Sequence, residues 1–315
     1  MSAPLVSVLL LTRDAGPPFA AVLAAIARQK APFPFEVVAI DSGSADGTLA
    51  LLEGAGVRTI PVAPADFNHG ATRNLGIASC RGDFVVMLVQ DAEPDDDGWL
   101  ARLVAPLLED ETLAGTYARQ LPLPDAGAVP RAYLARYSAS TAEPRIQELR
   151  GVEALRAMRP SQRLQACTFD NVCSCIRRTA WSRHPFPRVP IAEDVEWARE
   201  VMLDGYRLAY VPQSRVRHLH DRPASYELRR TYLVHQQLRR LLGLRTVPSV
   251  VHLLAAVAVS MASHTAWIAR AEGSWRRKPR QLPRAAALAV ALPLGQYLGA
   301  KSADSGRELL RVRGV

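Results

Sequence analysis

The first 110 residues alternate short apolar segments with segments expected to be helical, and this alternation limits the possible folds more than any other feature. The apolar segments span residues 5–11, 35–40, 57–62 and 84–89. Each has the length and the flanking turn residues of a buried strand. Helices are expected at 19–29, from 48 to 53 and at 70–78. Strands that alternate with helices form βαβ units, so we predict an α/β fold with a mostly parallel sheet flanked by helices.

Three of these strands end in polar residues. Thr12 and Arg13 follow the first strand, Asp41 and Ser42 the second, and Asp91 and Glu93 the fourth. The carboxyl ends of parallel strands lie at one edge of a sheet, which is where open α/β sheets bind their ligands. The sequence therefore predicts a ligand site at this edge.

The segment Gln90–Pro94 (Gln-Asp-Ala-Glu-Pro) ends the strand at 84–89 abruptly. Two carboxylates two residues apart suit a hard divalent cation that carries a phosphate. The alternative is a solvated acidic turn, because three further aspartates follow at 95–97.

The glycine-rich segments are not those of a dinucleotide-binding or P-loop protein, since the chain lacks both signatures. A nucleotide would have to be held in another way. Asp41 could accept a hydrogen bond from a base imide, and Arg73, in the first turn of a helix, could reach a phosphate or the base. The alternatives are an aspartate that shapes a turn and a surface cation.

The chain after residue 110 is less regular. A short strand and turn are expected at 117–122, a strand-like run at 165–177, a helix at 195–203 and a strand at 206–211. Glu193 and Asp194 precede the helix, where capping is the alternative to a functional role. His218 and His220 alternate like strand residues and would point to one face. One of them could complete the coordination of a metal at Asp91, or both could be ordinary strand residues.

The composition is that of a globular protein, with 49% hydrophobic and 22% charged residues. The four cysteines have neither the number nor the spacing of a disulfide framework or a zinc finger, so we interpret them as reduced structural thiols. The first 16 residues lack the basic and apolar segments of a signal peptide. These features favour a reducing cytoplasm.

The net charge of +9 is concentrated in the C-terminal third. Residues 222–315 contain 16 Lys and Arg against 4 Asp and Glu, a local charge of +12. We therefore expect a catalytic domain at 1–221 and a basic helical region at 222–315. The charge predicts an anionic partner, either nucleic acid or an anionic membrane surface.

Two apolar segments, 246–269 and 285–298, lie on either side of a Trp-Arg-Arg-Lys-Pro-Arg cluster at 275–280. The first has no Lys, Arg, Asp or Glu, and most of its Ser and His side chains share one arc of a helical wheel. Such helices favour a peripheral association with anionic lipid. The alternatives are an ordinary helical subdomain, a contact surface of a homo-oligomer and a true membrane span.

Six segments, in this order and spacing, resemble the inverting glycosyltransferases of family 2, which have the GT-A fold. They are VAIDSGSADGT at 38–48, FNHGATRNLGIA at 67–78, LVQDAEP at 88–94, YARQLP at 117–122, EDVEWAREVMLDGY at 193–206 and VRHLH at 216–220. Three of them, with the motifs FNHGATRN, QDA and ARQ, are similar to bacterial dTDP-rhamnosyltransferases of polysaccharide biosynthesis. The resemblance covers about residues 5–240.

This resemblance implies transfer of a sugar, L-rhamnose, from a nucleoside-diphosphate sugar to a hydroxyl of a growing, lipid-linked glycan, with Mg²⁺ or Mn²⁺ as cofactor. Asp194 would be the catalytic base. The nucleotide-sugar pocket would be lined by Thr12, Arg13, Asp41, Arg73, Gln90 and Asp91. Contacts with the donor or acceptor sugar would come from Arg119, Gln120, Asn171 and Glu193. The metal ligands would come from Asp91, Glu93, His218 and His220. Asp91 and Glu93 lie in a segment that reads Asp-Ala-Glu where the family has Asp-x-Asp.

The chemistry of inverting transfer agrees with these roles. One base takes the proton of the acceptor hydroxyl, and no second carboxylate nucleophile is needed. A cation stabilises the departing diphosphate. A carboxylate at a helix N-terminus, such as Asp194, is expected to stay ionised and ready to accept a proton.

Other functions fit the sequence less well. The donor could be a different UDP- or GDP-sugar. A sugar nucleotidyltransferase would also carry acids at strand ends, but the chain lacks a basic, glycine-rich phosphate loop. A nucleic-acid-binding protein is disfavoured because the basic region has few aromatic residues and no recognisable module. We therefore expect an enzyme of the cytoplasm, located peripherally on the inner face of the cell membrane.

Overall fold

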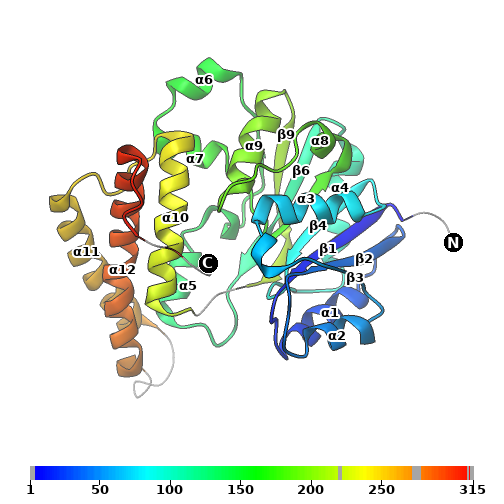
Figure 1. Ribbon diagram of the computed structural model, residues 1–315, viewed down its shortest axis with the longest axis horizontal. Helices are drawn as coiled ribbons and strands as arrows, with labels where there is room; N and C mark the ends of the chain where they lie inside the picture. Colours follow the sequence, from blue (N-terminus) through cyan, green and yellow to red (C-terminus); the bar gives the residue numbers. More distant parts are fainter. Residues whose placement is uncertain (1–3, 219–221, 272–277, 311, 313–315) are drawn as a thin grey trace. The chain divides into compact units, whose positions relative to one another are not determined.

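The computed structural model describes residues 4–218, 222–271, 278–310 and 312 (Figure 1). The chain forms two compact units. The first consists of Met1–Leu123, Tyr137–Ala157 and Gln165–Leu219, and the second of Pro124–Arg136, Met158–Leu164 and His220–Val315. The sequence alone puts a single boundary at residue 221. In the structure, the segments 124–136 and 158–164 also belong to the second unit.

A sheet of nine strands, counted over the described residues, forms the centre of the first unit. Its order is β3-β2-β1-β4-β8-β6-β9-β5, and β7 pairs with β9. The strands are β1 Val6–Thr12, β2 Phe35–Asp41, β3 Arg58–Pro61, β4 Phe84–Val89, β5 Glu93–Pro94, β6 Leu113–Leu121, β7 Arg145–Gln147, β8 Cys173–Arg177 and β9 Arg207–Arg217. Neighbours among β3, β2, β1 and β4 are parallel, β8 is antiparallel to both β4 and β6, and β9 is parallel to β6. The carboxyl ends of β1, β2, β4, β6 and β9 therefore lie at the same edge.

Helices cover both faces of this sheet. They are α1 Phe19–Ala27, α2 Thr48–Gly54, α3 His69–Ser79, α4 Trp99–Glu109, α6 Val152–Ala157, α8 Arg178–Arg183 and α9 Glu193–Leu203, with short 3-10 turns at Pro64–Asp66 and Ser138–Ser140. Figure 1 shows α1 and α2 on one side of the parallel strands and α3 on the other.

The alternation of side chains along β1 explains these layers. Val8 and Leu10 belong to a core cluster that also contains Phe19 of α1 and Trp99 of α4, all fully buried. Leu9 points the other way, because successive strand residues face opposite sides. There it meets α3 at Gly76, where an added Cβ would lie 2.6 Å from the leucine side chain. The absence of a side chain at this position lets α3 pack tightly against the sheet.

The prediction of an α/β fold with a mostly parallel sheet is confirmed, and the first four strands lie where their apolar runs indicate. The strand-like run at 165–177 is a correction, since only Cys173–Arg177 forms a strand and the residues before it belong to a helix end and a loop. Hydrophobicity misled here because Cys167 and Phe169 are buried as loop residues. The four cysteines are buried and form no disulfide in the described chain, as predicted.

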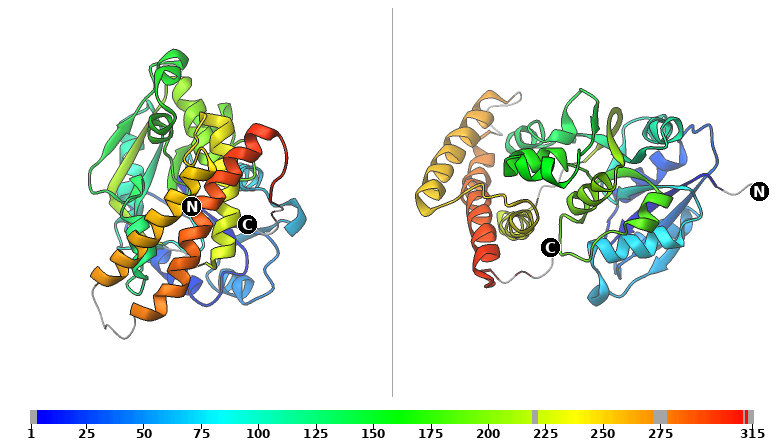
Figure 2. Two further views of the ribbon diagram at one scale, coloured as in Figure 1. Left: turned by 90° about the vertical axis from the view of Figure 1, so that its left-hand side faces the viewer. Right: turned by 90° about the horizontal axis from the view of Figure 1, so that it is seen from above.

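The second unit is helical. It contains α5 Ala128–Leu134, most of α7 Pro160–Ala166, and the long helices α10 Ala224–Leu242, α11 Val250–Arg270 and α12 Lys278–Ser305. The predicted C-terminal helical extension is thus confirmed. Within this unit α12 lies between α10 and α11, as Figures 1 and 2 both show.

Two glycines set the distance between α10 and α12. An added Cβ at Gly295 would lie 2.8 Å from the carbonyl oxygen of Leu228, and one at Gly299 would lie 2.3 Å from that of Tyr232. Both obstacles are backbone atoms, which cannot turn aside as a flexible side chain does. The two helices therefore pack through close backbone contact, which the hydroxyl of Tyr232 extends by donating to Ser302 Oγ at 2.8 Å.

One helix of the described chain, α11, is long and apolar enough to cross a membrane when judged by length and composition alone. Its mean hydropathy is 1.4, and little of it is buried.

We predict that Gly299→Ala lowers the thermal stability of the protein, because the new methyl group overlaps the Tyr232 carbonyl oxygen. Overpacking of this kind costs about 1–3 kcal/mol. Gly54→Ala is the matched control, since a Cβ at that helical position meets nothing within 4 Å. Differential scanning calorimetry of both variants checks the prediction, and an unchanged melting temperature for Gly299→Ala would contradict the close packing.

Candidate active site

The loops that follow β1 and β2 are joined by hydrogen bonds around the Asp41 carboxylate. Its Oδ1 accepts from the backbone N–H groups of Gly43 and Ser44, at 3.0 and 2.8 Å. Its Oδ2 accepts from the hydroxyls of Thr12 and Ser44, at 2.8 and 2.6 Å. Asp41 and Thr12 are buried, so four donors satisfy a carboxylate that would otherwise be costly to bury. The loop is therefore formed before any ligand arrives.

A second set of bonds ties β1 to β4. The side chain of Gln90 accepts from the backbone N–H of Arg13 at 2.7 Å and donates to the carbonyl of the same residue at 3.0 Å. This paired contact fixes the backbone of Arg13, whose side chain is exposed. Gln90 thereby positions the start of the acidic segment beside the end of β1.

A chain of polar contacts runs from Asp91 to the loop before β8. Asp91 Oδ1 lies 3.6 Å from His218 Nε2. The other ring nitrogen of His218 is 2.9 Å from Gln120 Oε1, and Gln120 Nε2 donates to Asp170 Oδ2 at 2.5 Å. His218, Gln120 and Asp170 are all buried. Residues from four separate segments of the chain thus form one network.

The order of donors in this network fixes the tautomer of His218. Because the amide nitrogen of Gln120 donates to Asp170, its oxygen faces the histidine, and an amide oxygen can only accept. Nδ1 of His218 must therefore carry a proton. In the neutral ring the lone pair is then on Nε2, the atom nearest Asp91. A histidine held in this way by its other nitrogen is oriented to bind a metal.

The N-terminus of α9 presents Asp194. Ala192, the residue before the helix, has φ of 61°, a left-handed conformation that is unfavourable for alanine and turns the chain sharply into the helix. Asp194 is half-buried, and its Oδ1 accepts from the N–H of Val195 at 2.8 Å. Its Oδ2 is 3.5 Å from the N–H of Asn171. Asn171 also lies beside Glu193, with its amide nitrogen 3.4 Å from Oε1.

A buried ion pair joins α3 to α9. Arg73 Nη1 lies 2.7 Å from Glu193 Oε1, and each side chain is 6% exposed. Arg73 is part of the FNHGATRN segment, whose two asparagines hold the chain that leads to α9. Asn68 caps α3 and donates to the carbonyl of Val189, and Asn74 donates to the carbonyl of Phe186. The segment therefore builds the surroundings of Asp194.

These charges divide the carboxylates into two kinds. Burial tends to raise the pKa of Glu193, but the Arg73 guanidinium, the nearby His69 and hydrogen bonds from the helix backbone and Asn171 together hold that pKa below its usual value. Arg73 also acts on Asp194, but its charge does not offset the effects that raise the pKa of that carboxyl. Burial, followed by the negative charges of Glu193 and Asp170, raises the pKa of Asp194 to about 7. The expectation that a carboxylate at this helix N-terminus stays ionised did not take into account burial and the neighbouring carboxylates, which both raise the pKa of Asp194.

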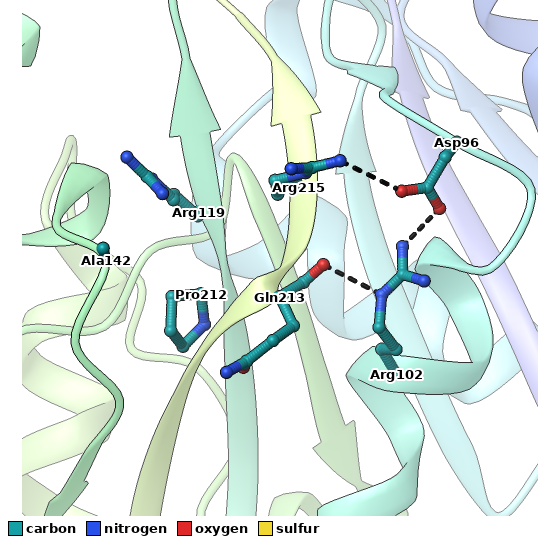
Figure 3. Close-up of a pocket in the computed structure, with 7 residues that line it drawn as sticks. All are labelled: Asp96, Arg102, Arg119, Ala142, Pro212, Gln213 and Arg215. Atoms are coloured by element: carbon teal, nitrogen blue, oxygen red, sulfur yellow. Dashed lines mark hydrogen bonds and ion pairs between the residues drawn. The ribbon is translucent and has the colours of Figure 1, made fainter.

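Arg119 is the predicted sugar-binding residue that lies outside this network. Alternation along β6 turns it to the face opposite Gln120. It lines a pocket of about 370 Å³ with Arg102 and Arg215, at the irregularity where β9 bulges at Pro212 and Gln213 (Figure 3). Its Nε donates to the carbonyl of Ser140 at 2.9 Å. The role of Arg119 as a sugar contact stays a prediction.

The acidic run at 95–97 is not a solvated turn. Asp95 pairs with Arg215 and Arg217, at 2.9 and 2.6 Å. Asp96 pairs with Arg102 and Arg215, and Asp97 with Arg28 and Lys30. These pairs anchor the chain just after the candidate metal ligands.

Asp91 and His218 are the predicted metal ligands that the structure brings together. Within the described residues, no group of three or more His, Cys, Asp or Glu side chains is arranged to hold a metal ion. Glu93 lies in β5, opposite Arg217 of β9, and does not complete such a group. His220 lies outside the described residues. The roles of Glu93 and His220 as ligands stay predictions.

Sequence reasoning missed Asp170. It lies next to the predicted Asn171, and its carboxylate orients Gln120 and raises the pKa of Asp194. The only signal in the sequence was a polar Asp-Asn pair inside an apolar run. Asn74 was also missed as a site-building residue, although it lies in a segment that had been singled out.

Comparison with known proteins identifies the family of this chain. The family model described as glycosyl transferase family 2 matches residues 7–183. The chain belongs to this family.

Two curated relatives of this family 2 glycosyltransferase come from Salmonella. The chain is 31% identical over 202 residues to the O-antigen chain rhamnosyltransferase WbaN of Salmonella anatum, a match that covers 63% of this chain and 61% of WbaN. It is 30% identical over 231 residues to the O-antigen chain rhamnosyltransferase RfbN of Salmonella typhimurium, covering 72% of this chain and 70% of RfbN. The match thus covers somewhat less than two thirds of the length of WbaN and somewhat more than two thirds of the length of RfbN.

A solved structure shares the fold. The mannosyltransferase PcManGT from Pyrobaculum calidifontis, in complex with GDP-Man and Mn²⁺, has a TM-score of 0.60 and 19% identity, and the match covers 98% of this chain and 89% of that one. An identity this low supports the fold alone, and the predicted GT-A fold is confirmed.

We predict that Asp194→Asn stabilises this glycosyltransferase at alkaline pH. The folded-state pKa of about 7 exceeds the ordinary value of 3.8, so folding favours the protonated carboxyl and ionisation costs stability as the pH rises. The neutral amide removes that cost. We expect a rise in melting temperature of roughly 2–4 °C at about pH 8, the effect of about 1 kcal/mol in a domain of this size, and a smaller rise at about pH 5.

Thermal melts at the two pH values measure this difference. Glu200→Gln, an exposed substitution in the same helix, is the control and should change little at either pH. A lower melting temperature for Asp194→Asn at both pH values would mean that its charge is needed for folding.

Proposed function

We propose that this family 2 glycosyltransferase transfers L-rhamnose from dTDP-rhamnose to a hydroxyl group of a growing, lipid-linked glycan, with inversion at the anomeric carbon. The observation that carries the proposal is one polar network at the carboxyl edge of the sheet, with Asp194 at one end and Asp91 at the other. The choice of sugar is supported by two relatives that are named as O-antigen chain rhamnosyltransferases.

Asp194 acts as the base in this mechanism. A pKa of about 7 lets the carboxylate exist in its ionised form near neutral pH while remaining basic enough to take a proton from an acceptor hydroxyl. The buried Arg73–Glu193 pair next to it holds the helix start in place. Arg73 and Glu193 neutralise each other. They therefore contribute to sugar or nucleotide binding by holding the neighbouring parts of the site in place.

Asp91 and His218 would hold the divalent cation, Mg²⁺ or Mn²⁺. The two side chains fit it, since a carboxylate and an imidazole nitrogen, oriented by the contact of the ring with Gln120, approach each other at the strand edge. Mg²⁺ sites commonly take only one or two protein carboxylates and complete their shell with phosphate and water. When bound, such an ion neutralises the charge that develops on the leaving diphosphate.

The nucleotide would lie over the ends of β1 and β2. Asp41, with Thr12, holds the loop at 42–44 in a fixed shape, and Gln90 holds Arg13 with its side chain exposed. We propose that this preformed surface receives the base and ribose, with Arg13 beside the phosphates. Preorganisation lowers the cost of ordering the loops when donor binds.

A donor screen tests the function. Purified protein is incubated with dTDP-rhamnose, UDP-glucose or GDP-mannose and with Mg²⁺ or Mn²⁺, and both donor affinity and nucleoside diphosphate release are measured. We expect dTDP-rhamnose to bind at least about tenfold more tightly than the others, a difference of about 1.4 kcal/mol. Preference for another donor would replace rhamnose, and failure of every donor to bind would contradict sugar transfer altogether.

Asp194→Asn separates binding from chemistry. We expect it to bind the donor like the wild type and to lose about 10²–10⁴-fold in kcat, the range typical of a missing general base. The wild-type rate should rise as the pH increases through about 7, as Asp194 ionises. Glu200→Gln is the control for substitution in α9. Turnover near the wild-type rate in Asp194→Asn would remove this residue as the base.

A further inference from the structure

Helix α11 exposes an arc of large apolar side chains although one of its histidines is buried. The helix exposes Val251 at 75%, Leu254 at 67% and Val259 at 66%, whereas His264 is 1% exposed. Most surface helices turn their apolar side inward and their polar side to water. The exposed arc continues through several small residues and Met261, and it runs along most of the helix. In the second unit, taken by itself, this arc is an uncovered apolar surface.

Specific polar contacts hold α11 in this orientation. One ring nitrogen of His264 is 2.8 Å from the carbonyl oxygen of Ala285 in α12, and the other is 2.9 Å from the hydroxyl of Tyr133 in α5. Trp267 packs against Tyr133, and the Arg136 guanidinium lies 4.5 Å above its ring. Rotating the helix to bury its apolar arc would break all of these contacts. The fold of this unit therefore keeps the arc on its outside.

The charges around the arc select an anionic partner. No Asp or Glu occurs from residue 228 to residue 271. The helix ends at exposed Arg270, and Arg280 is exposed in the first turn of α12. The chain between α11 and α12 contains one acid, Glu272, and adds Trp275, Arg276 and Arg277 in sequence. An apolar arc about 30 Å long with cations at one end matches the surface of an anionic bilayer.

The same contacts oppose a helix that crosses the bilayer. A spanning α11 would carry α5, and Arg136 two residues after its end, to the membrane beside Trp267. A guanidinium there is costly. Packed as it is against α5 and α12, the helix has one free side, which suits a position parallel to the membrane plane.

We propose that the outer arc of α11, centred on Val251, Leu254 and Val259, is a membrane-docking surface that lies on the anionic phospholipid of the bilayer. The apolar side chains enter the interface, and the basic end of the helix contacts the lipid phosphates. The inference does not depend on which sugar the enzyme transfers. It defines a lipid-facing surface whose position in the chain differs from every catalytic residue considered above.

Vesicle flotation of the full-length protein tests this surface. We expect the wild type to float with vesicles containing about one third phosphatidylglycerol and to remain unbound with phosphatidylcholine alone, and binding to weaken at about 0.5 M salt. The double variant Leu254→Glu, Val259→Glu should lower the partition coefficient more than about tenfold. Leu108→Glu, an equally apolar residue exposed at 47% on α4, is the matched control and should float like the wild type.

Circular dichroism checks that the double variant is folded, and transfer to a water-soluble glycan acceptor checks that it is active. Because both substitutions lie on the exposed arc, we expect both readouts to match the wild type, whatever the donor. Flotation of the double variant equal to that of the wild type would overturn the proposal. Failure of the wild type to bind anionic vesicles would also overturn it. So would size-exclusion chromatography that shows a dimer formed through this arc, in a protein that does not bind the vesicles.

Discussion

The candidate active site is built around the ion pair between Arg73 and Glu193, which is buried and joins α3 to α9. The single Arg73 guanidinium lies near three carboxylates, those of Glu193, Asp194 and Asp170. The pair satisfies Glu193 and leaves Asp194 with an excess of negative charge nearby. Burial, together with the charges of Glu193 and Asp170, raises the pKa of Asp194 to about 7, the range that a general base requires near neutral pH. Structure and proposed chemistry thus have the same electrostatic cause.

The sheet supplies the second constraint. Parallel strands bring distant segments to one edge, but each strand offers only alternate side chains to a given face. Gln120 therefore joins the network of His218 and Asp170, while its neighbour Arg119 faces the pocket with Arg102 and Arg215. A single amide links the candidate metal side of the site to the carboxylate next to the base. Its orientation determines which nitrogen of His218 is available.

Much of the site was predictable because it lies in local motifs. The ends of β1, β2 and β4 are predicted by the positions at which the apolar runs stop. The resemblance of six segments predicts the family, which the family model confirms. Asp170 and the face of Arg119 were not predictable, since burial in a loop and the phase of a strand are set by distant residues. The same holds for residues 124–136, which read as part of the first domain yet pack with the C-terminal helices.

The sequence by itself determined the α/β class, the family and the identity of most polar residues at the strand ends, because hydrophobic periodicity and turn residues act over a few positions. The tertiary structure decided how these residues are charged and which way they face. The pKa of Asp194 is raised because the fold buries it and brings Glu193 and Asp170 beside it. Helix α11 keeps Val251, Leu254 and Val259 outside while Tyr133 and Ala285 hold His264 inside. Both effects depend on contacts between residues far apart in the chain, which local patterns do not encode.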